Sequence, residues 1–279
     1  MIHVAVLLTV FNRREKTLSC LERLFSQDRP SVRLTVHLLD DGSTDETSSA
    51  VHERFPEVVV LQGDGGCYWN GGMRRAWEDA VELQPDFFLW LNDDTELDAD
   101  ALTKLLRTSA FFADQAIVVG STRDAQTGGL TYGGVVRPYP LKPLYFERVT
   151  PSDRPGSAET MNGNCVLIPG AVAKAVGNLS HEFSHGMGDF DYGLRARQEG
   201  FEIWVAPGFV GTCSRNQEAG TWQDRTLPRR VRWQKIRSIK GLPPREWIQF
   251  ARRHAGLFWP LHWVAPYARV LVSPQRRTK

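Results

Sequence analysis

The stretch Leu34–Glu46, LTVHLLDDGSTDE, decides the fold because an apolar run ends abruptly in an acidic turn. Its first six residues predict a strand, Leu34–Leu39, which stops at Asp40-Asp41-Gly42. The next four residues, Ser43-Thr44-Asp45-Glu46, are a capping box, which predicts that a helix starts where the strand stops. A strand that leads directly into a helix is the repeating unit of α/β proteins.

The same alternation of strand and helix signals extends outward from this stretch in both directions. Continuous apolar runs predict strands that are buried on both faces: Val4–Val10, Val58–Leu61, Phe87–Leu91 and Ile117–Gly120. Apolar residues at helical spacing and helix-start signals predict the helices Arg14–Gln27, Met73–Leu83 and Ala101–Phe112. We therefore expect an α/β fold, a mostly parallel sheet flanked by helices, with its ligands beyond the carboxyl ends of the strands.

The regular alternation of strand and helix signals ends after about residue 122. Gly128–Pro143 is rich in glycine and proline and predicts an irregular or hairpin segment. Shorter elements follow: a strand at Cys165–Ile168, helices at Ala171–Val176 and Asp191–Glu199, and a strand at Phe201–Val205. We expect an α+β elaboration that closes over the sheet edge, so that residues 1–220 form one domain with halves of about 1–122 and 123–220.

Charge divides the chain of 279 residues, although its formal net charge is only +2. Residues 225–279 hold 14 basic residues and one acidic residue, Glu246, whereas the rest holds 20 basic and 31 acidic residues. This asymmetry predicts an anionic partner for a basic extension at 221–279, and the acidic remainder argues against nucleic acid. The uncharged run His254–Ala268 is too short to cross a membrane, no secretory signal is evident, and four scattered cysteines suit a reducing cytoplasm.

Acidic pairs follow the second and fourth predicted strands, at Asp40-Asp41 and Asp93-Asp94. One interpretation is turn and helix-cap chemistry, in which aspartate is common. The other is a divalent cation, Mg²⁺ or Mn²⁺, which typically takes one or two carboxylates together with a substrate phosphate. Because crowded carboxylates repel each other, we favour the cation. No GxGxxG or GxxxxGK[ST] motif supports a dinucleotide or P-loop site instead.

Five motifs stand in order along the chain: residues 9–13 (TVFNR), 40–45 (DDGSTD), 92–94 (NDD), 163–165 (GNC), and 188–191 (GDFD) with Leu194-Arg195. In this order the chain resembles the bacterial family 2 glycosyltransferases, which are inverting nucleotide-sugar enzymes with a GT-A type fold. The resemblance covers about Val4–Phe209. It implies a nucleotide-binding half at 1–122 and an acceptor half at 123–220.

The resemblance also implies roles by position. Thr9 and Asp41 would bind the nucleobase, and Asp93 would lie near the ribose. Asp94 would bind the metal on the diphosphate, and Asp189 would be the general base that deprotonates the acceptor hydroxyl. A metal stabilises the charge that develops on a diphosphate leaving group, and a hydroxyl nucleophile needs a carboxylate within hydrogen-bond reach.

The remaining implied residues are Phe11, Arg13 and Arg195 on the donor side and Asn164 and Asp191 on the acceptor side. Two positions depart from the family pattern. Asn92 stands where the metal motif often has its first Asp, and Gly188 stands where Glu often precedes the catalytic Asp. Residues 211–214 (GTCS) also lack the late histidine that some relatives use as a metal ligand.

The loop Asp64–Arg74, DGGCYWNGGMR, has two interpretations. It is either a turn whose aromatic residues anchor the core, or a loop that approaches the donor through Trp69, Asn70 and Gly72. In the second case Trp69 stacks on a sugar, and the helix that starts at Met73 favours phosphate at its N-terminus. A similar loop occurs in the rhamnosyltransferase-like branch of the family, which suggests rhamnose as the donor sugar.

Residues 181–185 (HEFSH) match the HExxH motif of zinc metalloproteases, which requires both histidines on one helix. The glycine, asparagine and serine before them predict no such helix, so this interpretation is disfavoured. A second alternative is a nucleotide-sugar binding protein without turnover, which Asn92 and Gly188 would suit.

The basic extension mixes arginines and lysines with tryptophans and phenylalanines. It is either a helical lid on the acidic body, a nucleic-acid surface, or an amphipathic segment at a membrane interface. We favour the interface, where aromatic residues enter the headgroup region and basic residues meet anionic lipid. The sequence thus predicts a metal-dependent transferase on the inner face of the cell membrane. It would move a dTDP- or UDP-linked sugar to a lipid-linked saccharide of a bacterial surface polysaccharide.

Overall fold

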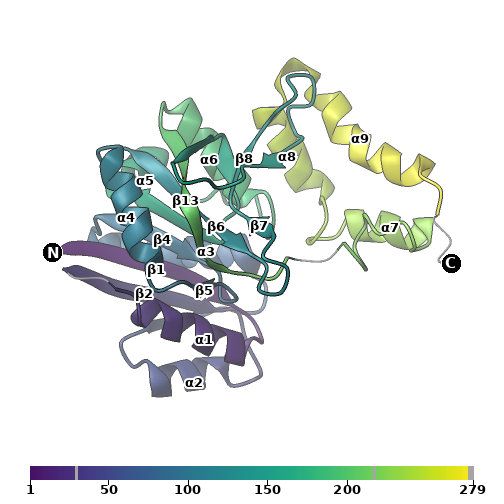
Figure 1. The fold of residues 1–279 in the computed structure, drawn as a ribbon. Coiled ribbons are helices and arrows are strands. Elements are labelled where there is room, and N and C mark those ends of the chain that lie inside the picture. The colour runs from purple at the N-terminus through teal and green to yellow at the C-terminus, as the bar shows by residue number, and fades with distance from the viewer. Residues whose placement is uncertain (29–30, 216–217, 276–279) are drawn as a thin grey trace.

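The computed structural model describes residues 1–28, 31–215 and 218–275. A ten-stranded sheet forms its centre, with the strand order β10-β13-β6-β12-β4-β1-β2-β3 and with β5 and β7 paired at its side (Figure 1). The strands are β1 (Ile2–Val10), β2 (Val32–Asp40), β3 (Val59–Gln62), β4 (Phe87–Leu91), β5 (Glu96–Leu97), β6 (Ala116–Arg123), β7 (Leu130–Tyr132), β10 (Gly156–Ala158), β12 (Cys165–Pro169) and β13 (Glu202–Thr212).

The pairing in this sheet is mostly parallel, as expected. Strand β1 runs parallel to β2 and β4, β2 to β3, and β6 to β13, whereas β12 is antiparallel between β4 and β6. A small sheet of β8 (Gly134–Val136), β9 (Glu147–Arg148) and β11 (Thr160–Met161) lies beside it. The predicted α/β fold is therefore confirmed.

Helices cover both faces of the sheet, which explains why its strands are continuous apolar runs. Alternate residues of β1 face opposite ways, so Val4 and Val6 pack in one core cluster and Ala5 and Leu7 in another. The first cluster includes α1 (Arg14–Phe25), α2 (Thr47–Arg54) and α4 (Ala101–Phe111). The second includes α3 (Tyr68–Ala80), α5 (Gly170–Val176) and α6 (Gly188–Gln198), and the 3₁₀ turn η1 (Val81–Leu83) follows α3.

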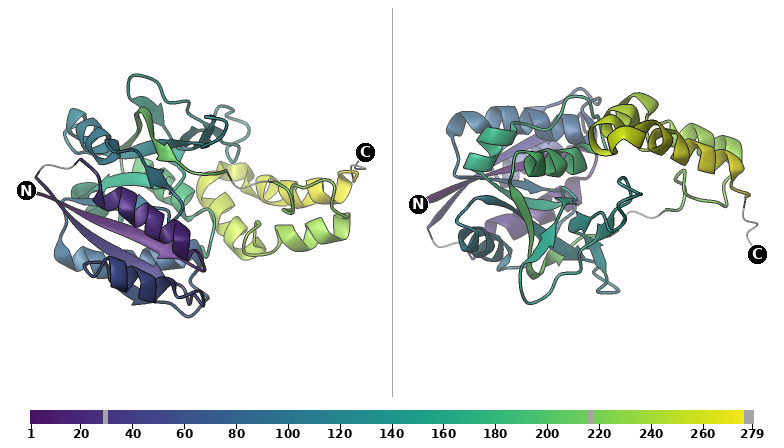
Figure 2. Two further views of the ribbon diagram at one scale, coloured as in Figure 1. Left: turned by 60° about the horizontal axis from the view of Figure 1, so that its bottom comes forward. Right: turned by 90° about the horizontal axis from the view of Figure 1, so that it is seen from above.

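Residues 221–275, the C-terminal lobe, project from the side of the body away from the N-terminus (Figures 1 and 2). The lobe contains α7 (Arg229–Ile236), α8 (Pro244–His254), the 3₁₀ turn η2 (Gly256–Phe258) and α9 (Trp259–Val272). A third hydrophobic cluster joins it to Phe183 and Leu194 of the body. The last four residues of the predicted extension lie outside the described residues.

Three helix starts differ from prediction. Helix α2 has no capping box, because Glu46 is left-handed (φ 63°) and the Asp45 carboxylate accepts from the Thr47 N–H. Helix α3 begins at Tyr68 rather than Met73, so Gly71 and Gly72 of the loop lie inside it. Helix α6 begins at Gly188 rather than Asp191, which places Asp189 in its first turn. No helix among the described residues is long and apolar enough to cross a membrane.

Candidate active site

A cleft of about 430 Å³ opens at the carboxyl ends of β1, β2 and β4, which are neighbours in the sheet. It brings together nine of the predicted site residues: Thr9, Phe11, Arg13, Asp41, Trp69, Asp93, Asp94, Asn164 and Asp189. Most come from strand ends or from the segments that follow them. We call this cavity the donor cleft, because it holds six of the nine residues that the sequence assigns to the donor.

The second acidic pair faces a positive charge inside the cleft. One guanidinium nitrogen of Arg13 lies 3.0 Å from an Asp93 carboxylate oxygen and 2.9 Å from one of Asp94. Burial, reinforced by the charge of Asp94, raises the pKa of Asp93 to about 6, although Arg13 opposes this shift. Carboxylate oxygens are the hard ligands that a divalent cation takes, but Arg13 already holds one oxygen of each residue; Asp94 has the more exposed side chain of the two (17% against 7%).

The first acidic pair instead follows the turn-chemistry interpretation. The Asp40 carboxylate accepts from the Ser43 N–H at 2.8 Å and from the Ser48 hydroxyl. The Asp41 carboxylate accepts three backbone N–H groups, those of Gly65 (3.0 Å), Cys67 (3.1 Å) and Tyr68 (2.8 Å). Asp41 thus fixes the loop that enters α3 while it also lines the cleft.

A further group of possible metal ligands surrounds Asp41. Ligand atoms of Asp41, Asp64 and Cys67 lie within 4.8 Å of one another. The carboxylate of Asp64 already accepts from the Gly66 N–H at 3.0 Å and contacts the Cys67 thiol at 3.8 Å. Because Asp41 also receives three N–H groups, these contacts account for the group as loop closure.

Asp189 lies across the cleft, in the first turn of α6. Its carboxylate accepts from the Gly163 N–H at 3.0 Å and from its neighbour Phe190 N–H at 2.9 Å. Burial raises the pKa of Asp189 to about 6, although these N–H groups favour the charged form. A carboxylate with a pKa slightly below neutral is both ionised at pH 7 and basic enough to take a proton.

The two departures from the family pattern have local causes. A Cβ atom on Gly188 would lie 1.7 Å from the Asn70 side-chain oxygen, so no larger residue fits there. Asn92 accepts a hydrogen bond from the Trp69 indole N–H at 2.8 Å. The ring of Trp69 also packs on Gly163, where a Cβ would come within 2.4 Å. Trp69 therefore both lines the cleft and is anchored, as its two interpretations separately predicted.

Four predicted site residues do not line the cleft, which corrects their expected placement. Asn70 is buried in α3 and donates to the backbone carbonyls of Ser180 and Phe183. Gly72 lets α3 approach β1, since a Cβ there would lie 2.1 Å from the Thr9 hydroxyl. The remaining two, Asp191 and Arg195, pair with each other at 2.9 Å on the opposite side of α6 from the cleft.

Asp191 instead joins the body to the C-terminal lobe. Its fully buried carboxylate also accepts from Arg253 at 3.0 Å and from the His254 ring at 2.9 Å, both in α8. Burial would raise the pKa of Asp191, but the hydrogen bond from His254 and the charge of Arg195 hold it below its usual value. Arg253 also forms an ion pair with Glu182, which extends the contact between the lobe and the body.

The HExxH interpretation is wrong because residues 181–185 form turns and bends rather than a helix. Glu182 is ion-paired with Arg253, and the Ser184 N–H and hydroxyl bond to Glu246 of α8. His185 lies in the cleft wall beside Tyr68. Tyr68, His185 and Lys240 are cleft residues that sequence reasoning missed. Each stands in a stretch that the sequence analysis singled out for another reason: Tyr68 in the loop 64–74, His185 in the HExxH match, and Lys240 in the basic run that begins at Arg229.

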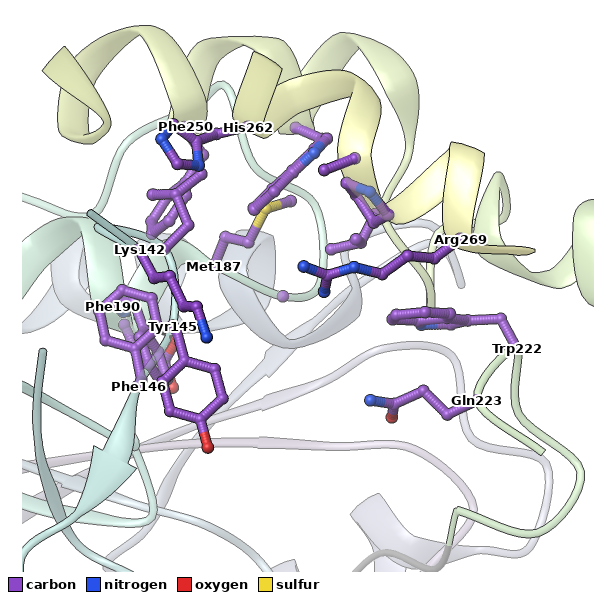
Figure 3. A pocket seen from close by; sticks show the side chains of 17 residues that line it. Lys142, Tyr145, Phe146, Met187, Phe190, Trp222, Gln223, Phe250, His262 and Arg269 are labelled. Atoms are coloured by element: carbon purple, nitrogen blue, oxygen red, sulfur yellow. Dashed lines mark hydrogen bonds between the residues drawn. The ribbon is translucent and has the colours of Figure 1, made fainter. Parts of the chain in front are cut away.

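A second cavity, of about 630 Å³, lies between the body and the C-terminal lobe (Figure 3). Aromatic side chains dominate its walls, among them Tyr145, Phe146, Trp222 and Phe250. We call it the aromatic groove. Asp189 and Gly186 line both the groove and the donor cleft, so the two cavities meet at the candidate base.

A mostly parallel sheet with carboxylates at its strand ends, facing a further carboxylate across a cleft, is the arrangement expected of a GT-A type glycosyltransferase. Residues 3–237 match the family described as "Glycosyltransferase like family 2". The chain therefore belongs to this family and is a glycosyltransferase. No curated protein matches it.

Solved structures of transferases share the fold. The mannosyltransferase PcManGT from Pyrobaculum calidifontis, in complex with GDP-Man and Mn²⁺, is 16% identical, with a TM-score of 0.56 over 97% of this chain and 70% of that chain. S. aureus TarS 1–349 in complex with UDP-GlcNAc is 14% identical, with a TM-score of 0.57 over 95% of this chain and 73% of that chain. At this identity the likeness concerns the fold.

Proposed function

We propose that this glycosyltransferase moves a sugar, with inversion, from a UDP- or dTDP-linked donor to a hydroxyl of a lipid-linked saccharide. The observation that carries the proposal is the meeting of the donor cleft and the aromatic groove at Asp189. A base at that junction can reach an acceptor in the groove and a donor in the cleft. Rhamnose, as the donor sugar, rests on the resemblance of residues 64–74 alone.

The proposed reaction divides between the two sides of the junction. Asp94, with Asp93 beside it, would hold Mg²⁺ or Mn²⁺, which when bound stabilises the charge of the departing diphosphate. Arg13 supplies a fixed positive charge at the same place. Asp189 takes the proton of the acceptor hydroxyl as that oxygen attacks the anomeric carbon from the face opposite the leaving group. The GDP-Man and Mn²⁺ bound by PcManGT support a nucleotide-sugar donor with a metal.

An apolar ridge on the C-terminal lobe supports attachment to a membrane surface. Leu257, Leu261, Val264 and Leu271 recur at helical spacing along η2 and α9 and are all exposed, Leu257 to 94%. Phe258 beside them is 70% exposed. An exposed apolar stripe on a lobe with 11 basic residues suits the surface of an anionic bilayer, where the acceptor lipid would lie. We therefore propose that the protein attaches to the inner face of the cell membrane.

Product formation by the wild-type protein tests the proposed function. Thermal-shift screening of UDP- and dTDP-sugars with Mg²⁺ or Mn²⁺ identifies the donor, and labelled sugar from that donor should then appear in a lipid extract. Binding of a donor without transfer or hydrolysis would favour the non-catalytic alternative. Flotation with anionic vesicles tests the membrane surface, and failure to bind at low salt would remove it.

A further inference from the structure

The aromatic groove contains three basic side chains from two separate segments: Lys142, His262 and Arg269. Lys142 belongs to the loop before β9, and the other two belong to α9. Figure 3 shows the side chains of Lys142 and Arg269 extending into the cavity from opposite walls. The sequence interval between Lys142 and α9 means that only the folded chain brings these side chains to one cavity.

The charges in the groove are unpaired within the described part of the chain. Neither Lys142 nor Arg269 forms a side-chain ion pair or hydrogen bond with any residue of 1–28, 31–215 or 218–275; Lys142 only lies over the Tyr139 ring at 5.2 Å. By contrast, Arg253 of the same lobe pairs with both Glu182 and Asp191. The cations of the groove are thus available to a ligand.

The residues around the basic side chains indicate which other chemical groups the ligand has. Tyr145 and Trp222 line the cavity near the basic side chains, and flat aromatic faces suit the apolar faces of sugar rings (Figure 3). A group of basic side chains suits an anion with several acceptor oxygens, which a phosphate or diphosphate offers. The cavity volume of about 630 Å³ lies within the range that binds small organic ligands.

We propose that the groove binds the acceptor through a phosphate or diphosphate group held by Lys142, His262 and Arg269, with its sugar against Tyr145 and Trp222. This inference rests on the proposed function and specifies the acceptor as a phosphate-linked saccharide. The sugar hydroxyl then lies at the Asp189 end of the cavity. Arg269 shares α9 with the apolar ridge, so the phosphate lies between the sugar and the surface that would face lipid.

Binding of three defined probes tests this proposal, with the donor cleft filled by whichever of UDP or dTDP the protein binds. The probes are farnesyl-diphosphate-linked N-acetylglucosamine, farnesyl N-acetylglucosaminide without the diphosphate, and glycerol phosphate as the soluble part of a phospholipid headgroup. Calorimetry should show that the first binds about tenfold tighter than either of the others, because charge-assisted hydrogen bonds to the diphosphate are lost in the second probe and the sugar contacts in the third.

The double variant Lys142→Gln/Arg269→Gln should erase the advantage of the diphosphate probe over the neutral one. Arg245→Gln is the matched control, because Arg245 is an exposed residue of the same lobe that does not line the groove, and it should keep the advantage. Equal binding of the first two probes by wild-type protein, or an advantage that survives in the double variant, would overturn the proposal. Equal binding of glycerol phosphate and the diphosphate probe would instead assign the cations to a lipid headgroup.

Failure of this inference can be separated from failure of the proposed function. Hydrolysis or transfer of the nucleotide sugar by wild-type protein depends on the donor cleft and is measured on the same preparation. A protein that turns over its donor but binds the three probes alike keeps the proposed function and loses the phosphate subsite.

Discussion

The donor cleft and the aromatic groove share Asp189, yet they are built in different ways. The cleft lies on the carboxyl ends of neighbouring parallel strands, and hydrogen bonds that backbone N–H groups donate to the Asp41 carboxylate shape it. The groove lies between a loop of the body and the C-terminal lobe, and aromatic packing shapes it. The cleft thus depends on contacts within the body, whereas the groove depends on how the lobe packs against the body.

Asp191→Ala should have the largest effect on this arrangement. The substitution leaves Arg195 and Arg253 without their buried carboxylate, so we expect the free energy of unfolding to fall by about 3 kcal/mol. Urea denaturation measures the change. Asp153→Ala, at an exposed site, should change it by less than about 0.5 kcal/mol. If both variants were equally stable, the Asp191 network would not be what holds the lobe to the body.

Asp94→Asn should act on the cleft alone. Loss of one carboxylate should weaken nucleotide-sugar binding in the presence of Mn²⁺ by about 10- to 100-fold, since interactions of charged groups contribute about 1.5–3 kcal/mol. Calorimetry with and without the metal measures this loss. Glu199→Gln, at the exposed end of α6, is the control of equal charge change. Metal-dependent binding that is the same in both variants would contradict the cation site at Asp93-Asp94.

The rate of transfer and the stability contributed by the buried carboxylates should change in opposite directions with pH. The pKa of Asp189 is about 6, so its basic form predominates at pH 7 and is lost as the pH falls through 6. Transfer should fall about tenfold between pH 7 and pH 5. Asp93 and Asp189 both have raised pKa values, so their protonation favours the folded state and their contribution to stability increases over the same interval. A flat rate profile from pH 7 to pH 5 would exclude Asp189 as the base.

Trp222→Ala should have the smallest effect and should act on the groove alone. Loss of one aromatic contact should raise the acceptor KM about three- to tenfold and leave the donor KM unchanged. Phe111→Ala removes an exposed aromatic ring of α4 and serves as the control. A rise in the donor KM instead would mean that the two cavities do not divide the substrates between them.

The donor cleft was largely predictable because apolar strands and the polar residues after them are adjacent in sequence. The order β4-β1-β2 then brings Thr9, Asp41 and Asp93 to one edge. The prediction was wrong for residues whose role depends on which side of a helix they face. Successive residues of a helix turn by about 100°, so Asp191 points away from Asp189, and Arg195 follows Asp191 on the same side. The early start of α3 similarly buried Asn70.

The aromatic groove could not be predicted from the sequence, although the basic and aromatic composition of the C-terminal residues was evident. The basic and aromatic character of residues 221–279 indicated a surface for an anionic partner. It could not indicate that Trp222 and Arg269 would face Lys142 and Tyr145, because only packing of the lobe on the loop around residue 142 joins these segments. The alternation of apolar and polar residues indicates which face of a helix or strand is buried. It does not indicate which distant element covers that face.

Transfer by the Asp189→Asn variant tests the junction of the two cavities most directly. Asparagine keeps the size of the side chain but removes the base, so transfer should fall by about 10²- to 10⁴-fold while the nucleotide sugar and the acceptor still bind. Initial rates and binding of both substrates should be measured on one preparation. A variant that binds both substrates and still transfers sugar at close to the wild-type rate would contradict the account.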